Sequence, residues 1–168
     1  MSDSKWKPPD KDEFKTNYDG VVFQETNEAG IGVVIRNDEG EVLGALSEKI
    51  ALPGSVVTVE MLAARRAAHF ALEIGISHSV FEGDFEIIDK ALSTDVTPFS
   101  SFGHIVKDTK SIASSLVNFS FSHTRRQGNF VAHALARRVR LSCCLLVRME
   151  SLPLDVSKFL LFFFFFSK

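Results

Sequence analysis

The sequence is poor in cysteine, and its two cysteines are adjacent in the chain. A disulfide between Cys143 and Cys144 would be strained and would close no useful loop. We therefore expect both thiols to be reduced and partly buried. This excludes a small secreted scaffold that depends on disulfides for its stability.

The sequence also lacks an apolar segment long enough to cross a membrane. Its longest apolar run, residues 159–166, is well short of the roughly 20 residues that a membrane helix needs. Residues 1–10 are polar, contain two prolines and have no apolar centre, so they do not form a signal peptide. We expect an intracellular protein, in the cytoplasm or the nucleus, without a membrane partner.

The composition as a whole is close to average. Ten glycines and five prolines are too few for a collagen-like chain, and 45% hydrophobic residues are too many for a wholly disordered one. A chain of 168 residues suits one domain, which can bury about two-thirds of its unfolded surface without help from a metal or a disulfide. The formal net charge of -2 gives no sign of a nucleic-acid partner.

The charge is nevertheless segregated along the chain. Residues 1–120 carry 19 acidic and 11 basic side chains, whereas residues 121–149 carry six arginines and no acidic side chain. Such a distribution suits a protein that binds phosphates through one part and a divalent metal through another. Arg125 and Arg126 enter a predicted helix, where an anion is favoured. For Arg137, Arg138 and Arg140, a solvated helix face is an equal alternative.

Hydrophobic periodicity predicts an α/β domain with the element order βββ-α-β-α-α-β-α. The turn Asn37-Asp38-Glu39-Gly40 joins the second strand to the third as a hairpin. The result is a mixed five-stranded sheet, an antiparallel meander extended by two crossover strands. We expect strands at 14–19, 31–35, 42–47, 79–83 and 118–122, and helices at 59–74, 87–92, 102–113 and 129–140. The predicted divisions are a flexible lead-in at 1–12, the domain at 13–141, and an extension at 142–168 with a low-complexity, Phe-rich end.

Three acidic residues stand out by their positions in these elements. Asp19 lies on the first strand, Glu60 lies in the first turn of the long helix, and Asp84 lies where the fourth strand ends. Ligand sites in such sheets usually lie at the carboxyl ends of strands. Each acid also has an ordinary structural interpretation, as a turn residue, a partner of the helix dipole or an N-cap. The spacing alone does not show that the three meet.

The order of motifs along the chain resembles type 1 ribonuclease H. More narrowly, it resembles the plant reverse-transcriptase-like domains related to non-LTR retroelements. The resemblance covers about residues 14–158, and no single motif is specific, whereas five in this order are. The motifs are Tyr18-Asp19-Gly20, the strand Gly30–Arg36, Thr58-x-Glu60-x-x-Ala63-x-x-x-Ala67, Glu82-Gly83-Asp84, and His123-x-Arg125-Arg126-x-Gly128-Asn129-x-x-Ala132-x-x-Leu135-Ala136.

The resemblance implies a monomeric, metal-dependent endonuclease that hydrolyses the RNA of RNA–DNA hybrids and needs no small-molecule cofactor. Asp19, Glu60 and Asp84 would hold two Mg²⁺ or Mn²⁺ ions, one activating water and one stabilising the leaving oxygen. The nucleic-acid contacts would include Arg125, Arg126 and Asn129. The hybrid would be recognised by its shape and its 2′-hydroxyl groups.

The sequence departs from the family at one position of the site. Active members usually carry a fourth carboxylate where this chain has His133, whose imidazole can bind Mn²⁺ or carry a proton but does not replace an anionic ligand. His123 lies ten residues earlier, at the spacing of the family's mobile catalytic histidine. The alternative to an active nuclease is therefore a degenerate module that binds nucleic acid or a partner protein without cleavage. A third hypothesis is an anchoring protein that docks through its Phe-rich end.

Overall fold

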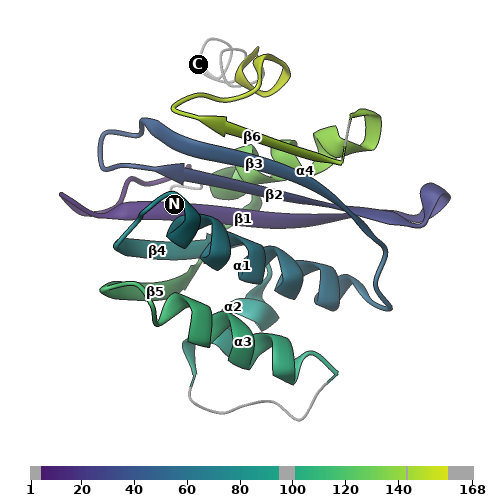
Figure 1. Ribbon diagram of the computed structural model, residues 1–168, viewed down its shortest axis with the longest axis horizontal. Helices are drawn as coiled ribbons and strands as arrows, with labels where there is room; N and C mark the ends of the chain where they lie inside the picture. Colours follow the sequence, from purple (N-terminus) through teal and green to yellow (C-terminus); the bar gives the residue numbers. More distant parts are fainter. Residues whose placement is uncertain (1–4, 95–100, 143, 159–168) are drawn as a thin grey trace.

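The computed structural model describes residues 5–94, 101–142 and 144–158. Within these ranges, a six-stranded sheet has the order β5-β4-β1-β2-β3-β6 (Figure 1). Its strands are β1 (Phe14–Phe23), β2 (Glu28–Arg36), β3 (Val42–Ala51), β4 (His78–Gly83), β5 (Asn118–His123) and β6 (Leu145–Met149). The strands β1, β2 and β3 form an antiparallel meander, and β4 and β5 extend it in parallel with β1. The mixed sheet expected from the sequence is confirmed.

The helices cover both faces of this sheet. They are α1 (Val56–Glu73), α2 (Glu86–Ser93), α3 (Gly103–Ala113) and α4 (Phe130–Arg138). Figure 1 shows α1, α2 and α3 on one face and α4 on the other. Two apolar clusters match the two layers, a large one centred on α1 and a small one that joins α4 to β2 and β3. The predicted order of elements is therefore found.

The sixth strand, β6, is an addition to the five that the sequence predicts. It pairs antiparallel with β3 and lies in the segment that the sequence analysis assigns to an extension of the domain. None of its side chains is buried, and Leu145, Val147 and Met149 are between 43% and 53% exposed. Because β6 has no buried face, hydrophobic alternation gives no signal for it. Its pairing comes from backbone hydrogen bonds at the sheet edge.

The central strand β1 is buried on both of its faces. Tyr18 packs into the cluster beneath α1, whereas Asn17 and Asp19 point to the opposite side and are fully buried. The polar side chains on that side are held by one another. The Nδ2 group of Asn17 donates to Glu82, and its Oδ1 atom accepts from Arg36. A buried polar layer of this kind needs such partners, because an unpaired buried polar group is costly.

Two glycines of β2 allow α4 to lie directly against the sheet. A Cβ atom at Gly32 would lie 2.1 Å from the carbonyl oxygen of Ala132, and one at Gly30 would lie equally close to that of Ala136. Only glycine fits at such distances. Gly32 is paired with Asp19 in the β1–β2 register. The close packing of α4 therefore brings its side chains to the strand position that carries Asp19.

The remaining expectations concern the two cysteines, the Phe-rich end and membrane-spanning segments. Partial burial is wrong for Cys144, which is exposed with a free thiol just before the edge strand. Cys143, residues 95–100 and the Phe-rich end at 159–168 lie outside the described residues. Among the helices that the structure describes, none combines the length and the apolar character of a membrane span.

Candidate active site

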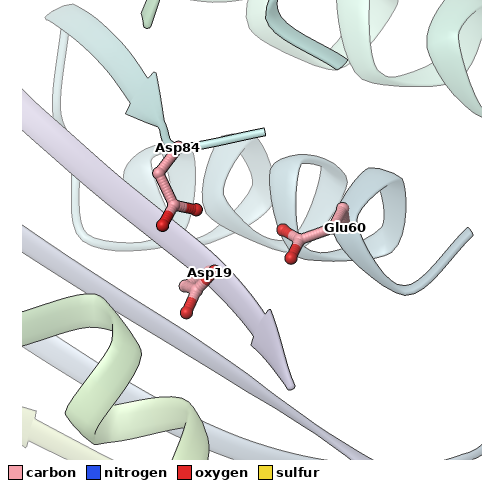
Figure 2. Close-up of side chains that lie close together, drawn as sticks. All are labelled: Asp19, Glu60 and Asp84. Carbon is pink, nitrogen blue, oxygen red and sulfur yellow. The ribbon is translucent and has the colours of Figure 1, made fainter. Parts of the chain in front are cut away.

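Three carboxylates from distant parts of the chain meet at one point. Asp19 lies in β1, Glu60 in α1, and Asp84 directly after β4. Their nearest ligand oxygens all lie within 4.8 Å of one another. Figure 2 shows the carboxylates of Glu60 and Asp84 pointing toward Asp19. The convergence that the spacing alone did not show is therefore present in the fold.

The ordinary structural roles considered for these acids do not fit their positions. The helix α1 begins at Val56 with Ser55 as its N-cap, so Glu60 lies in the second turn and not the first. Phe85, not Asp84, stands at the N-cap position of α2. Asp19 lies within β1 and not in a turn. The three side chains point toward one another, and the local structure of their own strands and helix does not account for this arrangement.

The local backbone brings Glu60 close to β1. Glu60 accepts a hydrogen bond from the backbone N–H of Gly20. A Cβ atom at Gly20 would lie 2.7 Å from the Cγ1 atom of Val59, so a side chain at this position would push α1 away from the strand. The glycine after Asp19 therefore sets the distance between the strand carboxylate and the helix carboxylate.

The cluster has an excess of negative charge. Burial, followed by the charges of Asp19 and Asp84, raises the pKa of Glu60 from 4.5 to about 9. Burial and the charge of Asp19 also raise the pKa of Asp84, and the guanidinium of Arg126 partly opposes this rise. The raised pKa values reflect burial first and mutual repulsion second, and a bound cation would offset both.

One oxygen of the cluster has no partner. The Oδ1 atom of Asp19 is buried and makes no hydrogen bond to the described residues. Buried carboxylate oxygens normally have partners, because leaving one unpaired costs free energy. Three carboxylates with a free oxygen form the hard donor set that Mg²⁺ and Mn²⁺ prefer. The residues present therefore fit a divalent metal.

The cationic side chain of Arg126 borders the cluster. The Nε atom of Arg126 lies 2.7 Å from Oδ2 of Asp84, and its Nη1 atom lies 3.9 Å from Oδ2 of Asp19. The Arg126 side chain is 59% exposed, whereas that of Asp84 is only 6% exposed. The guanidinium therefore lies over the outer side of the carboxylates. Arg125, its neighbour in sequence, is exposed and makes no ion pair within the described residues.

His133 also contacts the cluster, at the position where the sequence lacks a fourth acid. Its Nδ1 atom lies 2.6 Å from Oδ2 of Asp19 and 2.5 Å from Nη1 of Arg126. A single ring nitrogen either donates one hydrogen or accepts one. The Nδ1 atom can therefore donate to Asp19 or accept from Arg126, but it cannot do both. Among the described residues, the group of mutually close metal-ligand atoms contains the three carboxylates without His133.

Asn129 is placed differently from the sequence-based expectation. It is fully buried, donates from Nδ2 to the backbone carbonyl of Tyr18, and accepts from Asn17 through Oδ1. This placement does not fit a direct contact with nucleic acid. Asn129 instead ties the start of α4 to the strand β1, one residue before Asp19.

His123 ends the strand beside the one that leads to Asp84, and it has a partner that sequence reasoning missed. Its Nδ1 atom lies 2.7 Å from Oδ2 of Asp89 in α2. In the sequence, Asp89 resembles a surface acid of a short helix, next to Lys90. The available signal was its spacing, one residue after Ile88 and three before Leu92, which puts it on the edge of the apolar stripe.

Comparisons with known proteins agree with this architecture. A family model described as reverse transcriptase-like matches residues 17–139. RNase H1 from the halophilic archaeon Halobacterium salinarum NRC-1 is 19% identical over 76% of this chain and 97% of its own, with a TM-score of 0.70. LC11-RNase H1, isolated from compost and solved with an RNA/DNA hybrid, is 23% identical over 75% of this chain and 95% of its own, with a TM-score of 0.65. No curated protein matches the sequence significantly. The structural likeness shows the ribonuclease H fold.

Proposed function

We propose that this chain, which belongs to the reverse transcriptase-like family, is a metal-dependent endonuclease that hydrolyses the RNA strand of RNA–DNA hybrids. The observation that carries the proposal is the meeting of Asp19, Glu60 and Asp84 within 4.8 Å. A second support comes from the fold, since LC11-RNase H1 has been solved in complex with an RNA/DNA hybrid. The fold alone would not justify the activity, because function depends on the site.

The metal would be held by the three carboxylates. Asp19 offers the buried oxygen without a partner, and Glu60 and Asp84 offer carboxyls whose pKa values are raised by burial and by the neighbouring charges. Bound Mg²⁺ or Mn²⁺ supplies activation of water and stabilisation of the leaving oxygen, for which two ions are expected. Because Glu60 has a raised pKa, it must release a proton when it becomes a ligand.

The remaining residues of the site bind and orient. Arg125 is exposed at the entry to α4, where its guanidinium suits a phosphate of the nucleic acid. Arg126 contacts Asp84 and also reaches Nε2 of His133, 3.2 Å from its Nη1 atom. It therefore links the carboxylates to the basic segment of the chain. The Nδ1 atom of His133 contacts Oδ2 of Asp19 and so orients this carboxylate within the cluster.

The test is cleavage of a labelled RNA–DNA hybrid in Mg²⁺ and, separately, in Mn²⁺. Single-stranded RNA and duplex DNA of the same sequence serve as matched substrates. The proposal expects the RNA of the hybrid to be cut and both other substrates to remain intact. Equal cleavage of single-stranded RNA would contradict the hybrid specificity.

A second function is favoured by the contacts of Arg126 and His133. These side chains place one guanidinium on Asp84 and one imidazole on Asp19, so two of the three carboxylates already have partners without a metal. The second candidate is therefore a module that binds nucleic acid or a partner protein without cleavage. Hybrid binding that persists in EDTA and falls with salt, without cleavage in either metal, would favour it.

The proposal includes finer statements that rest on the order of motifs in the sequence. We propose that the chain is a plant domain related to non-LTR retroelements, that it acts as a monomer, and that it needs no small-molecule cofactor. Its substrates would be met in the cytoplasm or the nucleus. Light scattering of the purified chain and the location of a fluorescent fusion test the monomer and the compartment.

A further inference from the structure

The strand β5 places His123 beside the end of β4. His123 is the last residue of β5 and is paired with Gly83, the last residue of β4. Asp84 follows Gly83 directly. The neighbouring backbone N–H of Thr124 donates to the carbonyl of Gly83, which ties the two strand ends together. The imidazole therefore starts from a fixed backbone position next to the candidate metal ligand.

The imidazole of His123 contacts the buried carboxylate of Asp89. The side chain of Asp89 is 5% exposed, whereas that of His123 is 42% exposed. The Oδ2 atom of Asp89 lies 2.7 Å from Nδ1 of His123, and its Oδ1 atom accepts a hydrogen bond of 2.9 Å from the hydroxyl of Tyr18. Both carboxylate oxygens of Asp89 are therefore engaged.

Tyr18 connects Asp89 and His123 to the central strand β1. Tyr18 is fully buried and precedes Asp19 in β1. A Cβ atom at position 83 would lie 2.7 Å from the Tyr18 ring, so the glycine leaves the room that the ring occupies. The hydroxyl of Tyr18 thereby reaches Asp89 beneath the end of β4. The contacts run from β1 through α2 to the end of β5.

We propose that Asp89 is a positioning residue for His123. A carboxylate that accepts from Nδ1 fixes both the orientation of the ring and its tautomer, and so leaves Nε2 for other use. Within the described residues, no hydrogen bond engages the Nε2 atom of His123. The arrangement leaves one ring nitrogen free on a half-exposed side chain, next to the strand that leads to Asp84.

The role of Nε2 rests on the proposed function and is that of a proton carrier. In phosphodiester hydrolysis, the oxygen of water bonds to phosphorus, the bond to the leaving sugar oxygen breaks, and one proton passes from the water to the leaving oxygen. An imidazole can take up that proton and return it, so that His123 is unchanged after each turnover. Asp89 stabilises the transient imidazolium through Nδ1 and does not itself take the proton.

The first test measures the ring directly and does not depend on activity. In the full-length protein labelled with ¹⁵N, we expect the His123 ring to be protonated at Nδ1. In Asp89→Ala this preference should be lost, whereas Tyr18→Phe should retain it, because the contact between Asp89 and His123 remains. If Asp89→Ala does not fold, Asp89→Asn is the second variant. The Oδ1 atom of the asparagine can still accept a hydrogen bond from Nδ1 of His123, so this variant should preserve the tautomer although it lacks the charge. An unchanged tautomer in Asp89→Ala, or its loss in a folded Asp89→Asn, would overturn the proposal.

The second test is a double-mutant cycle on hybrid cleavage. Asp89→Ala and His123→Ala should each lower kcat by about tenfold or more with little change in KM. The double variant should be no slower than His123→Ala, because Asp89 acts through the ring. Asp108→Ala, which removes an exposed acid paired with Arg65 in another part of the molecule, should have no effect.

The outcomes separate the two proposals. An additive loss of kcat in the double variant, or a loss that Asp108→Ala reproduces, would show a structural role and overturn the positioning role. If the unaltered protein cuts no hybrid, the proposed function fails, whereas the NMR result still decides whether Asp89 fixes the ring of His123.

Discussion

The Nδ1 atom of His133 lies 2.6 Å from Oδ2 of Asp19, so an imidazole occupies the edge of a cluster that consists otherwise of carboxylates. The contact arises because α4 packs directly on the two glycines of β2 and carries His133 to the strand position of Asp19. An anionic side chain on the same helix position would face the same space. The identity of this one residue therefore changes the charge of the site.

Replacing His133 with aspartate should strengthen metal binding and increase hybrid cleavage. A carboxylate about 4 Å from a bound cation contributes on the order of 1–4 kcal/mol, which corresponds to roughly fivefold or more in affinity. Mn²⁺ titration by calorimetry and the cleavage rate measure the two effects. The control is His69→Asp, which makes the same change at an exposed position of α1. Unchanged metal affinity in a folded His133→Asp would contradict the three-carboxylate site.

The adjacent arginines Arg125 and Arg126 should have separable effects. Arg126→Gln removes the cation from Asp84 and should tighten metal binding about fivefold, the equivalent of the ~1 kcal/mol that a half-exposed ion pair contributes. Arg125→Gln should leave metal affinity unchanged and weaken hybrid binding, with a smaller salt dependence. Calorimetry with Mn²⁺ and hybrid titrations at several salt concentrations distinguish the two. Identical effects of both variants on metal affinity would rule out direct competition by Arg126.

The stability of the metal-free protein should fall as the pH rises. Burial and neighbouring charges raise the pKa of Glu60 from 4.5 to about 9, so the folded protein retains a proton that the unfolded chain has lost. The stabilising contribution of this proton is fully present below the lower pKa and is lost as the pH rises through the higher one. The raised pKa of Asp84 acts in the same direction.

The measurement is the free energy of unfolding in urea with EDTA, at several pH values within that interval. Glu60→Gln cannot ionise and should show a smaller dependence on pH than the unaltered protein. Saturating Mn²⁺ should also reduce the decline, because metal binding favours the ionised carboxyls. A Glu60→Gln variant with an unchanged slope would show that Glu60 is not the group responsible.

Gly32→Ala should destabilise the fold and displace α4. The added Cβ atom would lie 2.1 Å from the carbonyl of Ala132, and relief of this overlap requires movement of the helix backbone. We expect a loss of about 1–3 kcal/mol in the free energy of unfolding, typical of overpacking. Gly54→Ala is the matched control, since nothing lies within 4 Å of a Cβ at that position. Equal stability of the two variants would contradict the close packing of α4.

Much of the fold could be predicted from the sequence, because its strands and helices bury well-defined apolar faces. The hairpin at residues 37–40 and the later helices follow from periodicity and turn residues. The strand β6 could not be predicted, since it has no buried face. The positions of Asp19, Glu60 and Asp84 could be found from their motifs, but only the fold shows that they meet.

The remaining features of the site depend on contacts between distant elements. Asn129 matches a motif and still proves to be fully buried, because its partners on β1 are more than 100 residues away in sequence. Asp89 matches no motif that the sequence analysis identified, and its importance follows from its contacts with Tyr18 and His123. Local patterns report which face of an element is apolar, but they do not report which polar groups meet across the fold.

The most direct measurement of the central claim is hybrid cleavage by Asp19→Asn in Mg²⁺ and in Mn²⁺. Asp19 carries the buried oxygen without a partner, and its conversion to an amide removes one charge with little change in shape. The control is Asp38→Asn, the same change in the half-buried hairpin turn before β3. We expect cleavage by the unaltered protein and by Asp38→Asn, and none by Asp19→Asn. Cleavage that persists in Asp19→Asn, or that is absent from the unaltered protein in both metals, would contradict the proposed nuclease site.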